Sequence, residues 1–192
     1  MRIVKDPEER RQEIVDGAIR VFARKGYEKT AISDIAGEIG ISQGLCYRYF
    51  PSKEAIYDAA LDQYAAYIVE QNLARTQLAG KTLKEQILLM SGKTQEYSTA
   101  ERDLKPLYDL FHKEGNRKLH DQLSLRVSEK LVPLIAQVLR TAAERGEVRL
   151  SDPDAAAYFF VFGQMGILLD RTLPEETKAA RIQSCLIELL GL

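Results

Sequence analysis

One stretch, Thr30 to Glu54, carries the clearest structural pattern in this chain: TAISDIAGEIGISQGLCYRYFPSKE. It contains two short segments with apolar residues at helical spacing, Ile32–Ile39 and Gln43–Tyr49, on either side of Gly40-Ile41-Ser42. A helix that ends at a glycine, followed by a short turn and a serine that opens a second helix, is the helix-turn-helix arrangement. The stretch therefore predicts two short helices joined by a tight turn.

The sequence before this stretch predicts a third helix that can share a core with the other two. Asp6 is a good helix cap, Pro7 suits the first turn, and Gly26 ends the segment. Apolar residues recur at helical spacing between these signals, giving the segment one buried face. Thr30 is expected to cap the helix that follows it. These three helices can form a small bundle of about fifty residues.

The sequence after this stretch also predicts helices. We expect them at residues 52–76, 82–98, 104–112, 116–145, 152–169 and 174–190. Pro133 lies inside one of them, so that helix should kink or break into two. No segment alternates apolar and polar residues between hairpin turns. The predicted fold is all-α with about nine helices, divided into a helix-turn-helix domain at residues 1–54 and a larger helical domain at residues 55–192.

Composition sets limits on partners and on location. The chain has 192 residues, 45% of them hydrophobic, and a formal net charge of −1, so there is no global attraction to nucleic acid. Residues 1–53 hold ten basic and eight acidic side chains. The cysteines, Cys46 and Cys185, have no metal-ligand spacing, and no apolar run approaches the ~18 residues of a membrane span. These features predict a soluble cytoplasmic protein with no membrane partner.

The residues around the turn resemble those of the TetR/AcrR family of bacterial transcriptional regulators. The resemblance rests on Gly26-Tyr27, Thr30, Ile35-Ala36, Gly40-Ile41-Ser42, Gly44, Tyr47, Tyr49-Phe50 and Ser52-Lys53-Glu54. It implies a homodimer that binds a palindromic operator and leaves it when a small molecule enters the C-terminal domain. Cys46 stands where an aliphatic residue is common in the family, and Tyr49 where histidine is frequent.

The second helix of the motif is expected to read DNA. Backbone N–H groups at its start favour a phosphate, a glutamine can pair with adenine, and tyrosine, arginine and lysine side chains can reach phosphates or base edges. Cys46 and Phe50 should face the core with Ile35 and Ile39. Ser42 and Thr30 could instead serve only as caps, and Leu45 could pack against a neighbouring helix. The predicted DNA-binding residues are Thr30, Ser33, Ser42, Gln43, Gly44, Leu45, Tyr47, Arg48, Tyr49 and Lys53.

The segment at residues 154–169 is apolar on almost every side, so as a helix it must bury two faces. One face would pack against the core of its own chain and the other against a second subunit. The last helix could join it, so that two helices from each subunit form a four-helix interface. The alternative is a single chain that buries both faces internally. The predicted dimerisation residues are Phe159, Phe162, Gly163, Gly166, Leu169, Ile182, Leu186 and Leu189.

A pocket for a small-molecule effector would need apolar and aromatic lining. Candidate residues are Met90, Tyr97, Tyr108, Phe111, Phe162 and Met165, although aromatics at helical spacing suit a core equally well. His112 and His120 are eight positions apart, which does not place them on adjacent helical turns, so we expect no metal site. No catalytic residues and no cofactor are predicted, and we do not expect an enzyme.

The sequence thus predicts a DNA-binding transcriptional regulator, a repressor released from its operator by a small molecule. Its expected partners are a double-stranded DNA operator, a second copy of the chain and an unidentified effector. One alternative is a helical small-molecule-binding protein or enzyme with a vestigial DNA-binding head. Another is a helical adaptor that binds other proteins.

Overall fold

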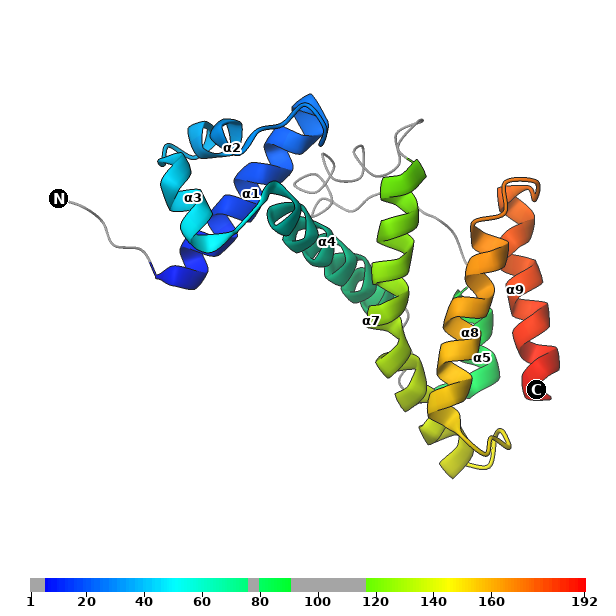
Figure 1. The fold of residues 1–192 in the computed structure, drawn as a ribbon. Coiled ribbons are helices and arrows are strands. Elements are labelled where there is room, and N and C mark those ends of the chain that lie inside the picture. The colour runs from blue at the N-terminus through cyan, green and yellow to red at the C-terminus, as the bar shows by residue number, and fades with distance from the viewer. Residues whose placement is uncertain (1–5, 76–79, 91–116) are drawn as a thin grey trace. The chain divides into compact units, whose positions relative to one another are not determined.

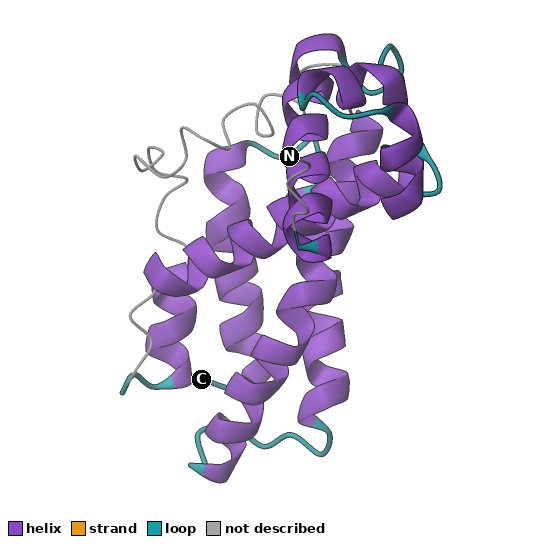
Figure 2. Ribbon diagram, turned by 90° about the vertical axis from the view of Figure 1, so that its left-hand side faces the viewer, coloured by secondary structure: helices purple, strands orange, loops and turns teal. Residues whose placement is uncertain are grey.

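The computed structural model describes residues 6–75, 80–90 and 117–192, which form eight helices and no strand (Figure 1). Figure 2 shows that loops join these helices throughout the described parts of the chain. The all-α prediction is confirmed. The expected helix at 104–112, and the end of the one expected at 82–98, lie outside the described residues. The helices are α1 Pro7–Lys25, α2 Ile32–Glu38, α3 Gln43–Tyr49, α4 Lys53–Arg75, α5 Leu83–Met90, α7 Arg117–Glu144, α8 Pro153–Leu168 and α9 Glu175–Leu190.

The chain divides into two compact units, and the division falls inside α4 and α7. One unit comprises Met1–Tyr64 with Tyr97–Leu123, and the other comprises Ala65–Glu96 with Ser124–Leu192. The first unit holds the whole helix-turn-helix stretch. The division of function between residues 1–54 and 55–192 remains a prediction.

Apolar side chains of α1 to α4 form the core of the first unit. Asp6 caps α1 by accepting a hydrogen bond from the Glu8 N–H at 2.9 Å. Gly26 ends the helix with a φ of 79°, a left-handed value that favours glycine. The predicted inward positions Ile35, Cys46 and Phe50 are confirmed, whereas Ile39 is only half-buried. The fully buried side chains of this core include Ile14, Phe22, Ile35, Cys46, Phe50 and Ile56.

Three ion pairs hold α2 against the end of α1. Glu38 accepts from Arg20 Nε at 3.0 Å and from Arg24 Nη2 at 2.7 Å, and Asp34 accepts from Lys25 Nζ at 2.6 Å. Hydrogen bonds from Arg24 and then Arg20 lower the pKa of the Glu38 carboxyl below its ordinary value. The backbone N–H of Ala31, followed by Lys25, lowers the pKa of Asp34. These ion pairs stabilise α2, which is too short to be a stable helix alone.

The start of α2 differs from the sequence prediction. Its cap is Ala31, and Thr30 is not the capping residue. The Asp34 carboxylate accepts from the Ala31 N–H at 2.9 Å and so satisfies the helix start from inside the helix. Thr30 is only 3% exposed, and its hydroxyl donates to the Gly26 carbonyl at 2.7 Å. Thr30 therefore closes the loop between α1 and α2.

The second unit has its own core, built from α5, α7, α8 and α9. Its buried side chains are Leu83, Ile87, Val132, Ala136, Leu139, Ala142, Val148, Ala157 and Val161. Pro133 lies inside a continuous α7, so of the two predicted outcomes, a kink or a break into two helices, the break is wrong. Its missing N–H is tolerated because Val132 and Ala136, on either side of it, are buried in this core.

Polar side chains of α9 fasten it to α5 and α8. The buried Lys178 donates from Nζ to the Leu168 carbonyl, the last of α8, at 2.8 Å. A cation is favourable at this end of a helix. Gln183 donates from Nε2 to the carbonyls of Ile87 and Leu88 in α5, at 3.2 and 3.0 Å. The described helices α8 and α9 are thereby held side by side (Figure 1).

Candidate nucleic-acid interface

The short helix α3 is anchored on one side only. Ser42 caps it by accepting from the Leu45 N–H at 3.2 Å, and the Phe50 N–H closes it onto the Cys46 carbonyl at 2.9 Å. Cys46 is fully buried and Phe50 is 1% exposed. Burial raises the pKa of the Cys46 thiol, which fits its role as a small apolar anchor. The opposite side of α3 is left facing solvent.

That solvent side carries polar and basic groups and no carboxylate. Gln43, Gly44 and Arg48 are exposed, and Tyr47 is 49% exposed. Tyr49 and Leu45 of α3 are half-buried. Ser42, the cap of α3, and Ser33, on α2, are exposed. Seven of the ten predicted DNA-binding residues therefore lie on α3 or its cap. Ser33 lies on α2, Lys53 opens α4, and Thr30 is buried.

Gly44 adds a steric detail to this surface. A Cβ built on it would meet no atom of the described chain within 4 Å. The protein's own packing therefore does not require glycine here, although glycine inside a helix costs about 1 kcal/mol relative to alanine. Its absent side chain leaves the backbone open to the close approach of another molecule.

Lys53 lies at the edge of the surface and has partners within the protein. Its Nζ donates to the Tyr27 carbonyl at 2.9 Å and lies 4.3 Å from the centroid of the Tyr27 ring. The Tyr27 hydroxyl donates to Glu54 Oε1 at 3.1 Å. Burial, then the hydrogen bond to Glu54, raises the pKa of Tyr27 to about 12. An ammonium group has three N–H donors, so Lys53 can join α4 to the loop before α2 and still offer donors outward.

Arg11 touches the far end of α3, a contact that the sequence did not predict. Its Nη1 donates to the Tyr49 carbonyl at 3.2 Å, and its guanidinium carbon lies 4.2 Å from the centroid of the Phe50 ring. The two partners are separated by 38 positions in the chain. No local pattern signals a contact of that range.

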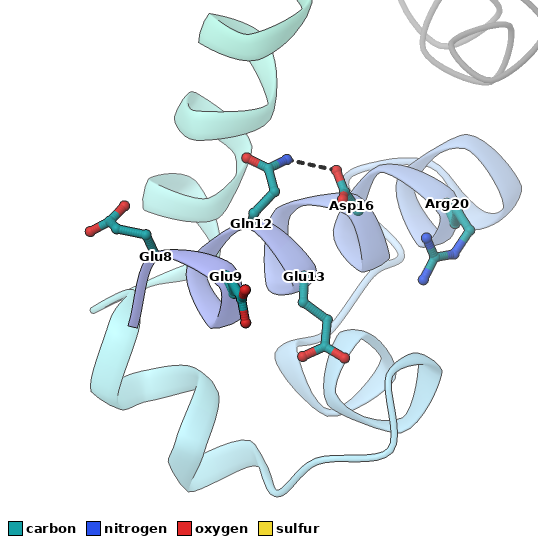
Figure 3. A pocket seen from close by; sticks show the side chains of 6 residues that line it. All are labelled: Glu8, Glu9, Gln12, Glu13, Asp16 and Arg20. Carbon is teal, nitrogen blue, oxygen red and sulfur yellow. Dashed lines mark hydrogen bonds between the residues drawn. The ribbon is translucent and has the colours of Figure 1, made fainter. Parts of the chain in front are cut away.

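An open hollow on α1 has the opposite electrostatic character. Figure 3 shows its six side chains along the helix, with Gln12 donating from Nε2 to Asp16 Oδ1 at 2.8 Å. Four of the six are carboxylates, which would repel a phosphate. This side of α1 is therefore acidic, whereas α3 carries one basic residue, Arg48, and no acidic one. The hollow is lined by Glu8, Glu9, Gln12, Glu13, Asp16 and Arg20.

The predicted dimerisation residues lie on α8, α9 and the residue after α8. Phe159 is 81% exposed and Leu189 is 67% exposed, and Gly163 and Gly166 are also exposed. Phe162, Leu169, Ile182 and Leu186 are half-buried. The Tyr158 and Phe162 rings stack with centroids 6.3 Å apart. Within this unit, α8 and α9 thus leave a large part of their apolar surface uncovered.

The predicted effector pocket is described only in part. Phe162 and Met165 are half-buried on α8, and Phe162 packs against the core of the second unit. The Met90 side chain, Tyr97, Tyr108 and Phe111 lie outside the described residues. In the part of the chain that the structure describes, no three His, Cys, Asp or Glu side chains gather to hold a metal ion. Among the same residues, no helix has the length and apolar character needed to cross a membrane.

Comparison with known proteins matches the helix-turn-helix unit to a family. Residues 14–60 match the model for bacterial regulatory proteins of the tetR family. YerO of Bacillus subtilis (strain 168), an uncharacterised HTH-type transcriptional regulator, is 40% identical over 78 residues, or 40% of this chain and 27% of the relative. IcaR of Staphylococcus aureus (strain Newman), the biofilm operon icaADBC HTH-type negative transcriptional regulator, is 37% identical over 51 residues, 27% of each chain. The chain thus matches about a quarter of the length of these relatives.

The fold of the whole chain also has a solved counterpart. A TetR-family transcriptional regulator from Pectobacterium atrosepticum superposes with a TM-score of 0.62 at 20% sequence identity, covering 96% of this chain and 93% of that chain. The fold and the outward face of α3 define a helical protein with an N-terminal helix-turn-helix domain. In sequence, residues 14–60 are similar to the domain that the tetR family of bacterial regulatory proteins shares.

Proposed function

We propose that this protein is a sequence-specific DNA-binding repressor that acts as a homodimer and is released by a small molecule. The observation that carries the proposal is the outward face of α3, which is polar and basic, free of carboxylates and fixed from behind by buried Cys46 and Phe50. A seven-residue helix held in this way can enter the major groove without reorganising. No catalytic role is proposed for any residue.

The side chains of this face suit two kinds of contact. Gln43, at the start of α3, can pair bidentately with adenine, and half-buried Leu45 can meet a thymine methyl group. Tyr47, Arg48 and Tyr49 can donate to phosphates or base edges, and Lys53 can add a donor from the start of α4. Ser33 and Ser42 can add hydroxyl contacts to the DNA backbone. Phosphate contacts would set the register, and base contacts would set the preferred sequence.

A homodimer is supported by the uncovered apolar surface of α8 and α9. Phe159 and Leu189 are too exposed for the internal-burial alternative to explain them within the described chain. Large apolar side chains exposed on two neighbouring helices favour an interaction site there. A two-fold dimer would present two α3 helices to successive major grooves, about 34–36 Å apart.

Control by a small molecule is supported by the length and position of helix α4. This helix begins at Lys53, beside the DNA-facing residues, and continues to Arg75 in the second unit. Within the first unit, Tyr57 of α4 donates from its hydroxyl to Gln122 Oε1 of α7 at 3.2 Å. An effector that favours a different placement of α7 would thereby act on the helix that supports α3. Such coupling requires two distinguishable states with different affinities for DNA.

Repression is the direction of control that we propose. The similarity of residues in this domain to IcaR, a negative transcriptional regulator, supports it. A dimer seated on a promoter excludes other proteins from the same DNA, so binding alone is enough to repress. A reporter gene behind the bound sequence should be less expressed when the protein is present.

The test is binding to a duplex that the unaltered protein selects from a random-sequence library. Arg48→Ala should weaken binding by about tenfold or more, in line with the ~1–3 kcal/mol of a good base contact. If Arg48 instead meets a phosphate, the slope of log K against log salt should become shallower by about 0.9. Arg149→Ala is the matched control, because Arg149 is an exposed arginine of the second unit. Binding by Arg48→Ala and Tyr47→Ala variants equal to that of the control would overturn the proposed surface.

A further inference from the structure

We infer that Arg11 is a positioning residue that fixes the C-terminal end of α3 and so contributes to discrimination between DNA sequences without touching DNA. This role for an α1 side chain rests on the proposed function of α3. It is argued from the contacts that Arg11 makes within the first unit.

The first step is the geometry at the end of α3. Tyr49 is the last residue of the helix, so its carbonyl has no partner inside the helix. Arg11 supplies one through Nη1 at 3.2 Å. Its guanidinium also faces the Phe50 ring at 4.2 Å, well inside the ~6 Å range of a cation–π contact. Phe50 is buried, so the ring is a fixed reference point in the core.

The second step is the chemistry of the guanidinium. It is planar and carries several N–H donors in a fixed arrangement, so it can lie over a ring while an edge N–H donates to a carbonyl. Its charge lies at the C-terminal end of α3, where a cation is favourable. Arg11 thus holds both the carbonyl of Tyr49 and the ring of Phe50, two adjacent residues at the end of the helix.

The third step is what that end of α3 carries. Tyr47 and Arg48 lie in its last turn, and a seven-residue helix has little stability of its own. If the turn is loose, these side chains sample several positions. Hydrogen bonds to base edges need a narrow geometry, so they are then weakened more than phosphate contacts are. Loss of Arg11 should therefore reduce sequence discrimination while leaving the number of phosphate contacts unchanged.

The first experiment needs no DNA. Amide hydrogen exchange of Phe50, whose N–H bonds to the Cys46 carbonyl, should be at least about fivefold faster in Arg11→Ala than in the unaltered full-length protein. Arg10→Ala is the matched control: it removes the same charge from the neighbouring position, where Arg10 pairs with Glu13 at 2.5 Å. The Phe50 exchange rate of Arg11→Lys should lie between those of Arg11→Ala and Arg10→Ala. Arg11→Lys also serves in place of Arg11→Ala if that variant does not fold. Equal Phe50 exchange in the Arg11 and Arg10 variants would overturn the inference.

The second experiment uses the selected duplex and a scrambled duplex of the same length. In Arg11→Ala, the ratio of the two affinities should fall about tenfold, while the slope of log K against log salt stays as in the unaltered protein. A slope shallower by about 0.9 with the ratio retained would make Arg11 a phosphate ligand instead. An unchanged ratio would also contradict the inference. If the unaltered protein selects no duplex, the proposed function fails, while the exchange result still decides whether Arg11 holds α3.

Discussion

Gly17 of α1 packs closely against Ile39, the residue that ends α2. A Cβ built on it would lie 2.4 Å from Cγ2 of Ile39, which is the branch of a stiff β-branched side chain. Gly17→Ala should therefore force the two helices apart and destabilise the protein by about 1–3 kcal/mol, the usual range for overpacking. Thermal unfolding followed by circular dichroism measures this change. Gly37→Ala is the control, since a Cβ there meets nothing within 4 Å. Unfolding midpoints that are equal in the two variants would contradict the close packing.

Glu38 makes the stability of the first unit depend on pH. Its pKa is lowered by Arg24 and Arg20, so between the folded and unfolded pKa values the unfolded chain binds more protons. The stabilisation is present above the ordinary pKa of 4.5 and is lost as the pH falls through the lowered value. We expect the midpoint temperature of unfolding to fall when the pH is lowered below 4.5. The Glu38→Gln variant should show a smaller fall. Glu144→Gln in α7 serves as control. An identical pH profile for all three proteins would show that these ion pairs contribute nothing.

At the scale of the elements, the sequence predicted α3 well because its signals are local. Ser42 caps the helix, and the spacing of Cys46 and Phe50 identifies the buried side. The start of α2 was predicted at Thr30 because threonine is a good cap, but the Asp34 carboxylate satisfies that helix start from within. The contact between Arg11 and Tyr49 could not be predicted, because it depends on how α1 and α3 pack across 38 positions.

The continuity of α7 also lay beyond the sequence pattern. Proline removes one backbone donor and strains the helix locally, so the sequence predicts a kink or a break at Pro133. Packing of the neighbouring Val132 and Ala136 in the core of the second unit offsets that strain. Whether Met90, Tyr97, Tyr108 and Phe111 line a pocket stays a prediction, because those side chains lie outside the described residues.

The α8–α9 pair supports a prediction about assembly. Phe159→Glu places a charge among the exposed apolar residues of α8 and α9 and should convert a dimer into a monomer, because burying an unpaired charge is costly. Sedimentation velocity at micromolar concentration measures the change. Leu125→Glu is the matched control, since Leu125 is an exposed leucine of α7 outside this surface. If the Phe159→Glu variant stays dimeric, the interface lies elsewhere. If the unaltered protein is a monomer, there is no such interface.

At the scale of the whole molecule, the charge balance supports the proposal that two copies of the chain act together. Residues 1–53 carry only two more basic than acidic side chains, and four of the carboxylates line the hollow on α1. If α3 binds DNA as proposed, one helix-turn-helix domain would gain little from the general attraction of DNA and would depend on the contacts of α3. In a dimer joined through α8 and α9, binding of the first helix-turn-helix domain to DNA would hold the second one close to its half-site. The overall affinity would then rise although each domain makes the same contacts as before.

The most direct test of sequence-specific binding by a two-fold dimer is selection of DNA by the unaltered protein from a random-sequence library. We predict enrichment of an inverted repeat whose half-site centres are about 10–10.5 base pairs apart, or a multiple of that spacing. A library that remains random after repeated rounds, or an enriched sequence without two-fold symmetry, would contradict it.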